Sequence, residues 1–519
     1  MAALSTGSDG RALVFIGFMG AGKSKAALAA RDAGLKATDA DDALERELGA
    51  SIEEFFATEG EAEFRRREEA FAADLLERAS GGAIALGGGS VVSERVRGAL
   101  ARHTVVWLDV DPDTAWTRVA GSGRPLAADR DRFDELHAER RPLYESLADA
   151  VLPADRELVR RALPALRALG ALPEGTRLAW GRSASGDYPV YVGRGLLASG
   201  FWPLEDRRFL VTDREVGRLY ADALEPLAGR VEVEPGERSK TLAEVERVMR
   251  ELAGAGMTRA DHVVALGGGV VGDLAGFCAA TYQRGVPLVQ VPSSLVAQVD
   301  SAYGGKTGVD LPEAKNYVGA YHLPAAVLTD LSLLCTLAEA ELAAGFVEVI
   351  KTALIAGGEL WDTVRAIDEL DPTSLDEVIF ACARTKLDVV AADERDSGLR
   401  QVLNLGHTAG HAIEAAGGYS RYRHGEAIGL GLLASLRLSD ADDLREEVRA
   451  LLARHGLPTE LAPDVDVDEV LAALARDKKR TAEGVPFVLL AEPGAPRPGA
   501  VFDPDRVRSA VEELQQQAR

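Results

Sequence analysis

Eight residues near the N-terminus constrain the fold more than any other part of the chain. Residues 17–24 read GFMGAGKS and match the pattern G-x-x-x-x-G-K-[ST]. An apolar segment at residues 12–16 precedes them and an alanine-rich segment follows, so we expect a strand, a phosphate-binding loop and a helix in that order. Glycines let the backbone turn its N–H groups toward phosphate oxygens, and the helix N-terminus adds positive potential. The motif predicts an α/β domain with a parallel sheet and a nucleotide site.

Residue types within this loop suggest how ATP and Mg²⁺ would be held. We expect the backbone of Gly20, Ala21 and Gly22 to cradle the phosphates. Lys23 can reach the β- and γ-phosphates, and the hydroxyl of Ser24 can ligate Mg²⁺. The acceptor of the phosphoryl group is not specified by this motif.

Chain length and composition limit the kinds of partner. The 519 residues are too many for one hydrophobic core, so about two to four domains are expected. The 82 acidic and 59 basic residues give a net charge of −23. Such a surface would repel nucleic acid and anionic membranes, and anionic substrates would need local clusters of Arg and Lys. We expect small-molecule substrates as partners.

Cysteine usage and the N-terminal segment point to the cytoplasm. Cys278, Cys335 and Cys382 are odd in number and far apart, which argues against a disulfide framework. The first ten residues lack the basic flank and apolar core of a signal peptide. No apolar run approaches the ~18 residues of a membrane helix.

Strand and helix patterns divide the chain into a first α/β part and a larger second part. After a tail at residues 1–10, alternating elements run over 11–167, and a Gly- and Pro-containing linker is predicted at 168–175. Residues 178–180 and 188–192 predict two strands, and residues 208–330 show the βαβ pattern of a parallel sheet. The predicted domains of this second part are an α/β subdomain at 176–336 and a mainly helical subdomain at 337–519. Helices are expected at 339–357, 375–393, 405–417, 425–439, 442–455 and 467–477, with one late strand at 486–490.

Several motifs after the loop resemble the shikimate kinase family over about residues 11–155. In order they are the acids at 39 and 41, GEAEFR at 60–65, GGG at 87–89, RPL at 124–126 and RRPLY at 140–144. The resemblance implies that Asp39 belongs to the Mg²⁺ shell and that Asp41 contacts the shikimate hydroxyls. It implies that Arg65 and Arg140 clamp the carboxylate, a task suited to planar guanidinium groups. Gly87, Gly88 and Gly89 would let the backbone approach substrate, while Arg124 would come from a lid and Arg118 would flank the adenine.

Three histidines late in the chain form a second constellation. His407 and His411 are spaced i, i+4, so they would share one helix face, and His424 follows. By itself this spacing suggests that the pair binds one metal. A second glycine triplet, at residues 267–269, follows a predicted strand and permits close backbone approach to a pyrophosphate.

The second part resembles 3-dehydroquinate synthase from about residue 176 to 519. The motifs that carry the resemblance include GGGVVGD at 267–273, GGKTG at 304–308, EVIK at 348–351, NLGHTAGH at 404–411 and HGE at 424–426. The resemblance implies bound NAD⁺ and a divalent metal, Zn²⁺ or Co²⁺, with Glu348, His407 and His424 as ligands. It gives His411 a substrate or acid–base role instead of the ligand role that spacing suggested.

The same resemblance implies two further sets of residues. The substrate set is Arg284, Lys306, Lys315, Asn316, Lys351, Lys386, Arg400, Asn404, His411 and one of Lys478 and Lys479. Five members of this set would also be catalytic: Lys306, Lys351, Arg400, Asn404 and His411. The NAD⁺ set is Asp213, Glu237, Lys240, Gly268, Gly269, Asp273, Ser293, Ser294, Asp300 and Thr336.

Together the two resemblances imply a bifunctional enzyme of aromatic biosynthesis. One activity would phosphorylate shikimate with ATP, and the other would convert 3-deoxy-D-arabino-heptulosonate 7-phosphate to 3-dehydroquinate and phosphate. A homodimer through the second part is expected from the synthase resemblance.

Two alternatives remain open at this point. The second part could be another sugar-phosphate cyclase or a metal-dependent polyol dehydrogenase, although its phosphate- and carboxylate-binding residue types argue against that. Alternatively, one half could be a non-catalytic regulatory or dimerisation module. The intact Lys23, Asp39 and Asp41 of the first part, and the three ligands of the second, argue against this.

Overall fold

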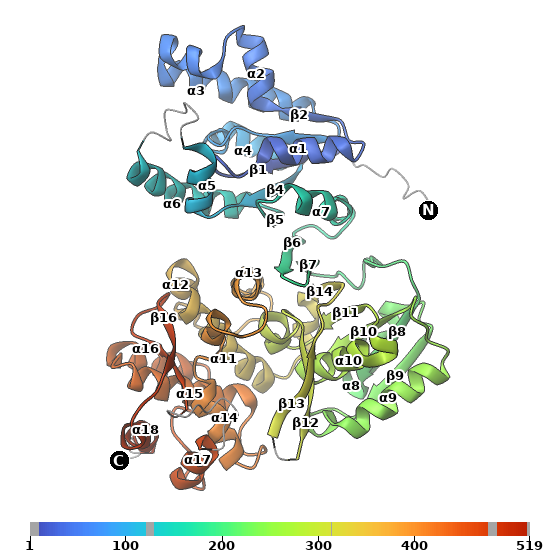
Figure 1. The fold of residues 1–519 in the computed structure, drawn as a ribbon, viewed down its shortest axis with the longest axis vertical. Helices are drawn as coiled ribbons and strands as arrows, with labels where there is room; N and C mark the ends of the chain where they lie inside the picture. Colours follow the sequence, from blue (N-terminus) through green and yellow to red (C-terminus); the bar gives the residue numbers. More distant parts are fainter. Residues whose placement is uncertain (1–9, 121–128, 313, 476–484, 516–519) are drawn as a thin grey trace. The chain divides into compact units, whose positions relative to one another are not determined.

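The computed structural model describes residues 10–120, 129–312, 314–475 and 485–515, and the chain forms two compact units (Figure 1). Unit 1 spans Met1–Trp180 and unit 2 spans Gly181–Arg519. Among the described residues, no helix is both long enough and apolar enough to cross a membrane.

Unit 1 is built on a parallel sheet. Its strands lie in the order β2 (Ala37–Asp39), β3 (Ala83–Ala85), β1 (Leu13–Ile16), β4 (Thr104–Asp109) and β5 (Ala150–Pro153), followed by the first residues of β6 (Arg177–Ser183). The connecting helices are α1 (Lys23–Asp32), α2 (Ala40–Leu48), α3 (Ile52–Arg78), α4 (Glu94–Leu100), α5 (Pro112–Val119), α6 (Arg130–Leu147) and α7 (Arg156–Leu169).

Burial explains why these apolar segments become parallel strands. All four residues of β1 are buried, as are the first five of β4, which is typical of strands covered on both faces. Because parallel strands end at the same edge, the P-loop after β1, Asp39 at the end of β2 and the glycine triplet after β3 come together. The sequence motifs therefore share one edge of the sheet.

The first part of unit 2 is a second α/β arrangement. Its parallel sheet has the order β7 (Gly186–Gly193), β14 (Ala326–Asp330), β11 (Leu288–Pro292), β10 (His262–Gly267), β8 (Arg208–Asp213) and β9 (Gly229–Val233). A core containing Val211, Val248, Val263 and Leu274 packs α9 (Leu242–Gly254) and α10 (Gly269–Thr281) against it. A short helix, α8 (Arg214–Tyr220), follows β8, and an antiparallel hairpin is formed by β12 (Lys306–Leu311) and β13 (Ala314–Tyr321).

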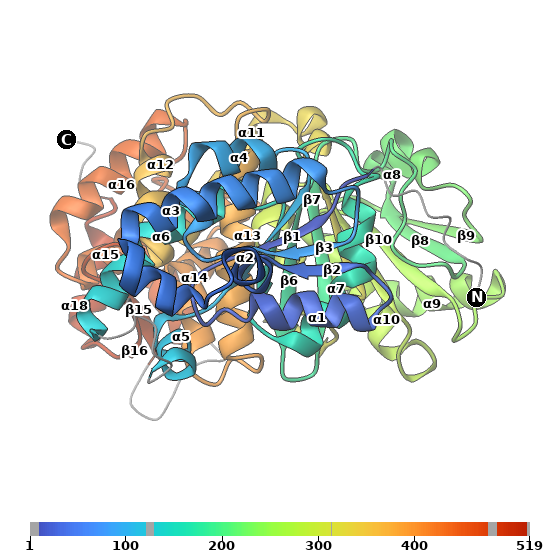
Figure 2. The ribbon, with the colours of Figure 1, turned by 90° about the horizontal axis from the view of Figure 1, so that it is seen from above.

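The second part of unit 2 is mainly helical. Its helices are α11 (Glu339–Ala356), α12 (Gly358–Arg365), α13 (Asp376–Ala392), α14 (His407–Ala416), α15 (His424–Leu438), α16 (Asp442–Arg454), α17 (Val467–Leu474) and α18 (Pro504–Glu512). Figures 1 and 2 both place α15, α16 and α18 at one end of unit 2 and β8 and β9 at the other.

The structure confirms the predicted α/β and helical parts and adds three elements. The short helices α12 and α18 were not predicted, and the single late strand is in fact a pair, β15 (Phe487–Leu490) with β16 (Pro496–Ala500). The β16 sequence PRPGA has two prolines and a glycine, which disfavour a strand. It forms because it pairs with a single neighbour, where missing N–H groups are tolerated.

Candidate active sites

The first site is a cavity of about 560 Å³ in unit 1. Its lining includes Ser24, Asp39, Asp41 and Gly88, and residues 20–26 of the loop form one wall. Gly17, Gly20 and Gly22 have φ values of 141°, 81° and 87°, a region that L side chains rarely adopt. A Cβ on Gly20 would lie 2.7 Å from the carbonyl oxygen of Ala115, so the loop conformation requires glycine there.

Lys23 and Asp39 already face this cavity. The Nζ of Lys23 donates to the carbonyl oxygens of Gly17 and Phe18 at 2.9 and 3.1 Å, which holds the ammonium over the loop. Asp39 caps α2 by accepting from the backbone N–H of Asp41 at 3.0 Å. Ser24 and Asp39 line the same space, so an oxygen-rich Mg²⁺ site fits the residues present.

A buried glutamate organises the expected shikimate side. Arg65 donates to Glu68 Oε2 at 2.6 Å, and the Ser90 hydroxyl donates to Glu68 Oε1 at 3.0 Å. A Cβ on Gly87 would lie 2.6 Å from Glu68 Oε1 and 2.9 Å from Asp41 Oδ1. The glycine triplet therefore lies directly against both carboxylates, and a Cβ on the third glycine would meet the Arg65 guanidinium.

The remaining predicted arginines of unit 1 approach the same region from α5 and α6. Arg140 donates to the Gly88 carbonyl at 3.4 Å, beside a 2.7 Å hydrogen bond from the Tyr144 hydroxyl to the same oxygen. Arg118 donates to the Gly20 carbonyl at 3.0 Å and lines the cavity. Arg124 lies outside the described residues.

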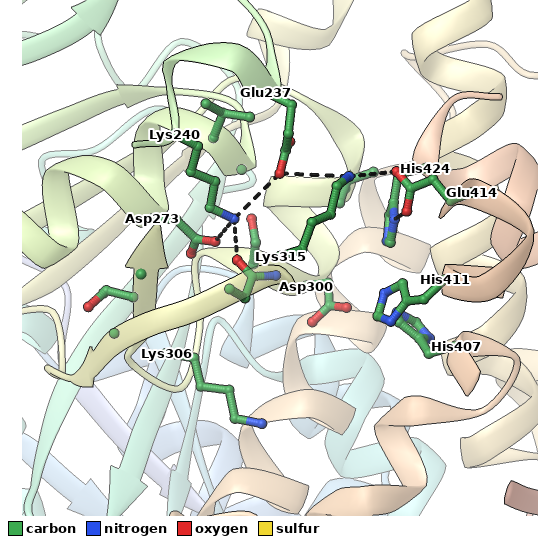
Figure 3. A pocket seen from close by; sticks show the side chains of 18 of the residues that line it. Glu237, Lys240, Asp273, Asp300, Lys306, Lys315, His407, His411, Glu414 and His424 are labelled. Carbon is green, nitrogen blue, oxygen red and sulfur yellow. Dashed lines mark hydrogen bonds and ion pairs between the residues drawn. The ribbon is translucent and has the colours of Figure 1, made fainter. Parts of the chain in front are cut away.

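The second site is a cavity of about 1280 Å³ in unit 2, and Figure 3 shows most of its charged residues. Helices α11, α14 and α15 supply Glu348, His407, His411 and His424, and the α/β part supplies the opposite wall. The predicted site residues that line it are Asp213, Glu237, Lys240, Gly268, Gly269, Asp273, Ser294, Asp300, Lys306, Lys315, Asn316, Glu348, Lys386, Arg400, Asn404, His407, His411 and His424.

The helical wall presents a cluster suited to a metal ion. One ring nitrogen from each of His407, His411 and His424 can lie within 4.8 Å of the others. Glu348 Oε1 is 3.5 Å from His407 Nε2 and 3.4 Å from His424 Nε2. Oε2 of this fully buried carboxylate lies 2.5 Å from Lys351 Nζ, so Oε1 is the oxygen that faces the two imidazoles. The donor set fits Zn²⁺ or Co²⁺, and the acid–base role of His411 stays a prediction, because its position also suits a ligand.

Electrostatics keep this cluster charged. Burial alone would raise the pKa of Glu348, but Lys351 at 2.5 Å and the two imidazoles hold that pKa well below its usual value. Burial would lower the pKa of His424, yet the carboxylates of Glu348 and Glu414 raise it to about 9. Glu348 is therefore held as a carboxylate, either beside cationic side chains or bound to a metal ion.

Opposite the histidines, the start of α10 offers a dinucleotide site. The helix begins after Gly268 without a side-chain cap, so its backbone N–H groups remain available to phosphate. Cβ atoms on Gly268 and Gly269 would lie 3.2 and 3.1 Å from serine hydroxyls, which leaves little room for side chains. Lys240 pairs with Asp273 at 2.6 Å and lies 3.8 Å from Glu237 (Figure 3).

Several cationic side chains in and behind the cavity lining are held by carboxylates or by carbonyl oxygens. Asp300 pairs with both Lys351, at 3.0 Å, and Lys386. Lys306 pairs with Asp396 at 2.6 Å. Arg400 is 2% exposed and donates to the carbonyl oxygens of Glu394 and Gly304 at 2.6 and 3.2 Å.

Some predicted residues are not brought into the cavity lining. Arg284 is exposed and has a φ of 72°, and Thr336 is exposed with its hydroxyl 2.6 Å from that of Tyr220. Ser293 and Lys351 are buried behind the lining, the latter within reach through its pairs with Asp300 and Glu348. Lys478 and Lys479 lie outside the described residues.

Two buried carboxylates were missed by the sequence reasoning. Glu68 follows Arg65 at i+3 on α3, and this helical spacing could have indicated that the two side chains pair. Glu414 lies seven residues after His407 on α14, hence on the same helix face, and contacts both Lys315 and His424.

Comparisons with known proteins agree with this division. The family models for the N-terminal and C-terminal parts of 3-dehydroquinate synthase match residues 230–344 and 345–480, and the shikimate kinase model matches residues 19–166. A 3-dehydroquinate synthase from Symbiobacterium thermophilum is 42% identical over 350 residues, which covers 63% of this chain and 98% of the relative. One from Halorhodospira halophila is 41% identical over 353 residues, covering 65% and 99%.

Solved structures show the same fold for unit 2. A 2-epi-5-epi-valiolone synthase from Streptomyces hygroscopicus subsp. jinggangensis, with NAD⁺ and Zn²⁺ bound, is 27% identical with a TM-score of 0.57, covering 63% of this chain and 96% of that one. A 2-deoxy-scyllo-inosose synthase complexed with carbaglucose-6-phosphate, NAD⁺ and Co²⁺ has a TM-score of 0.57 at 24% identity, covering 65% and 99%.

Proposed function

The chain belongs to the 3-dehydroquinate synthase family and carries a shikimate kinase domain ahead of the synthase, and from this premise we propose how its own residues perform two reactions. It is a bifunctional enzyme of the shikimate pathway: a kinase, and a lyase that eliminates phosphate. The observation that carries the proposal is that each unit has its own cavity, lined by many of the residues predicted for its reaction.

In unit 1, the P-loop and Lys23 bind the phosphates of ATP, while Ser24 and Asp39 hold Mg²⁺. Asp41 accepts a hydrogen bond from the attacking hydroxyl of shikimate, and Arg65 and Arg140 fix its carboxylate. Arg118 flanks the nucleotide, and Arg124 neutralises charge on the transferring group. Phosphoryl transfer needs mainly such positioning and charge stabilisation.

In unit 2, the start of α10 and the acids near it would hold NAD⁺, and Glu348, His407 and His424 would hold a divalent metal. When bound, these two groups supply reversible hydride transfer and polarisation of substrate hydroxyls. The chain itself orients the substrate: Lys306, Lys315, Asn316, Lys351, Lys386, Arg400, Asn404 and His411 supply the donors for its phosphate and carboxylate. His411, on the face of α14 next to His407, moves a proton at its ring nitrogen.

The acids around these cations also serve the cofactor. The acids Asp213, Glu237, Asp273 and Asp300 line the cavity together with Lys240, and these side chains suit the hydroxyls and amide of a dinucleotide. The serine pair at 293–294 and Thr336 belong to the same proposed set, and one of Lys478 and Lys479 to the substrate set. Arg284, which lies outside the cavity lining, belongs to the proposed substrate set as well.

Two assays on the full chain test the two activities. Heptulosonate phosphate supplied with NAD⁺ and Zn²⁺ should release inorganic phosphate, and shikimate supplied with MgATP should yield ADP. Absence of phosphate release would overturn the synthase assignment, and absence of shikimate-dependent ADP formation would overturn the kinase assignment. Glucose 6-phosphate and sedoheptulose 7-phosphate, offered to the synthase site, test the alternative that unit 2 serves another sugar-phosphate cyclisation.

Three further properties complete the proposal. The functional domains are residues 11–167, 176–336 and 337–519, and a linker at 168–175 joins the first to the second. The protein works in the cytoplasm, in keeping with three cysteines that form no disulfide pair. The synthase part forms a homodimer, for which analytical ultracentrifugation of the full chain and of a variant lacking residues 1–175 is the direct test.

A further inference from the structure

Glu414 is a buried carboxylate that none of the assigned roles uses. It lies on α14, and its side chain is 5% exposed. Its Oε1 accepts a 2.7 Å hydrogen bond from Lys315 Nζ, and its Oε2 lies 3.5 Å from His424 Nδ1. Figure 3 shows Lys315 joined by a dashed line to Glu414, with the ring of His424 next to Glu414.

The two ring nitrogens of His424 face different carboxylates. Nε2 is 3.4 Å from Glu348 Oε1, on the metal-binding side, and Nδ1 is 3.5 Å from Glu414 Oε2, on the opposite side of the ring. Glu414 Oε2 accepts no hydrogen bond from the described residues, although it is buried. A buried carboxylate with an unused oxygen beside an imidazole N–H is arranged to accept that proton donor.

The other oxygen of Glu414 links the two parts of unit 2. Lys315 comes from β13 of the α/β part, whereas Glu414 comes from the helical part. Lys315 also lies 3.8 Å from Glu237, which in turn lies 3.8 Å from Lys240. The position of Glu414 is therefore fixed by a charged partner outside its own helix, so its second oxygen is held in place beside His424.

We propose that Glu414 is a positioning residue for the metal site: held by Lys315, it accepts the Nδ1–H of His424 and so presents Nε2 to the metal. The inference rests on the proposed metal site at Glu348, His407 and His424. Hydrogen-bonded partners behind a metal-binding histidine fix its tautomer and ring orientation, and their loss typically lowers metal affinity roughly 10- to 100-fold.

The test measures Zn²⁺ affinity of the full-length, metal-free protein by competition with a chromophoric chelator, without NAD⁺ or substrate. We expect Glu414→Gln and Glu414→Ala to raise the Zn²⁺ dissociation constant by roughly 10- to 100-fold. The increase for the Ala variant should be at least as large as that for the Gln variant. The melting temperature and the circular dichroism spectrum of the metal-free protein verify that each variant is folded. If Glu414→Ala fails this check, the isosteric Gln variant decides the result.

Two control variants show whether a loss of Zn²⁺ affinity is specific to Glu414. Glu341→Gln removes an exposed carboxylate that lines the same cavity and pairs with Arg423 at 2.7 Å, and it should leave the affinity within threefold. Lys315→Met removes the residue that holds Glu414 but leaves the acceptor of His424 in place, so it should weaken Zn²⁺ binding by less than Glu414→Gln does. A loss from Lys315→Met as large as that from Glu414→Gln would overturn the proposal, because the ion pair would then account for the effect.

His407→Ala separates this inference from the function it rests on. If His407→Ala weakens Zn²⁺ binding and folded Glu414→Gln does not, the positioning role is wrong and the metal site stands. If neither variant changes the affinity, the metal site itself is placed wrongly and the positioning role falls with it.

Discussion

Replacing Glu68 with glutamine should impair shikimate binding and leave ATP binding intact. Glu68 is 7% exposed and receives a 2.6 Å hydrogen bond from Arg65 on one oxygen and a 3.0 Å bond from Ser90 on the other. Glutamine keeps the shape but can offer only one acceptor oxygen to these two donors. If Ser90 retains that oxygen, an amide N–H group faces the guanidinium, and Arg65 leaves the position from which it would hold the substrate carboxylate.

The size of the effect follows from the bond that is lost. A hydrogen bond between charged groups contributes about 1.5–3 kcal/mol. If that energy holds Arg65 in its binding position, kcat/KM for shikimate should fall roughly 10- to 150-fold, at 1.36 kcal/mol per factor of ten. The loss should appear mainly as a higher KM for shikimate, because Arg65 binds the carboxylate equally before and during phosphoryl transfer.

A coupled ADP assay with each substrate varied in turn measures this effect. Glu63→Gln is the matched control, since Glu63 lies on the same helix and pairs only with the exposed Arg66 and Arg67 among the described residues. It should change neither KM. An unchanged shikimate KM in folded Glu68→Gln, or an equal rise in the KM values for ATP and shikimate, would refute the argument.

Three other outcomes are expected. Lys23→Ala should abolish only kinase turnover and His407→Ala only phosphate release, because their cavities lie in different units; loss of both activities from either change would show that the units are coupled. Burial lowers the pKa of His262 from its ordinary 6.5 to about 4. As pH falls from 6.5 toward 4, the unfolded chain therefore binds a proton at this histidine that the folded chain does not, and the folded state loses stability. Over that range the melting temperature of wild type should fall more steeply than that of His262→Gln, and parallel curves would contradict this. Gly20→Ala should lower kinase turnover and destabilise unit 1 by about 1–3 kcal/mol, because φ is 81° and the new Cβ would meet the Ala115 carbonyl, which calorimetry can check.

The fold was predictable where local sequence determines structure. The glycines at 17, 20 and 22 have positive φ values that a side chain would resist, so the pattern of the loop specifies its conformation directly. The long buried helices were also predictable, and α11 at Glu339–Ala356 matches the expected 339–357. The strand β16 was not, since its residues disfavour a strand and only its pairing with β15 creates it.

The residues that make up the sites were predictable from sequence motifs, but many of the contacts between them were not. Motifs named Arg65 and His424, but the carboxylates that hold them depend on how neighbouring helices pack. Glu68 reaches Ser90, 22 residues away, and Glu414 reaches Lys315, 99 residues away in the chain. Helical spacing could have indicated either carboxylate as a neighbour of a known site residue, whereas the second contact of each is tertiary and has no local signature.

Pairing of site cations with acids explains how a chain of net charge −23 can bind anionic substrates. Lys315 is held by Glu414, Lys306 by Asp396, and Lys351 and Lys386 by Asp300. Each acid fixes the position of a long flexible side chain, so less conformational entropy is lost when a phosphate or carboxylate arrives. The same acids offset the mutual repulsion of cations crowded into one cavity. Anion binding by this protein therefore depends on the geometry of preformed pairs more than on net charge.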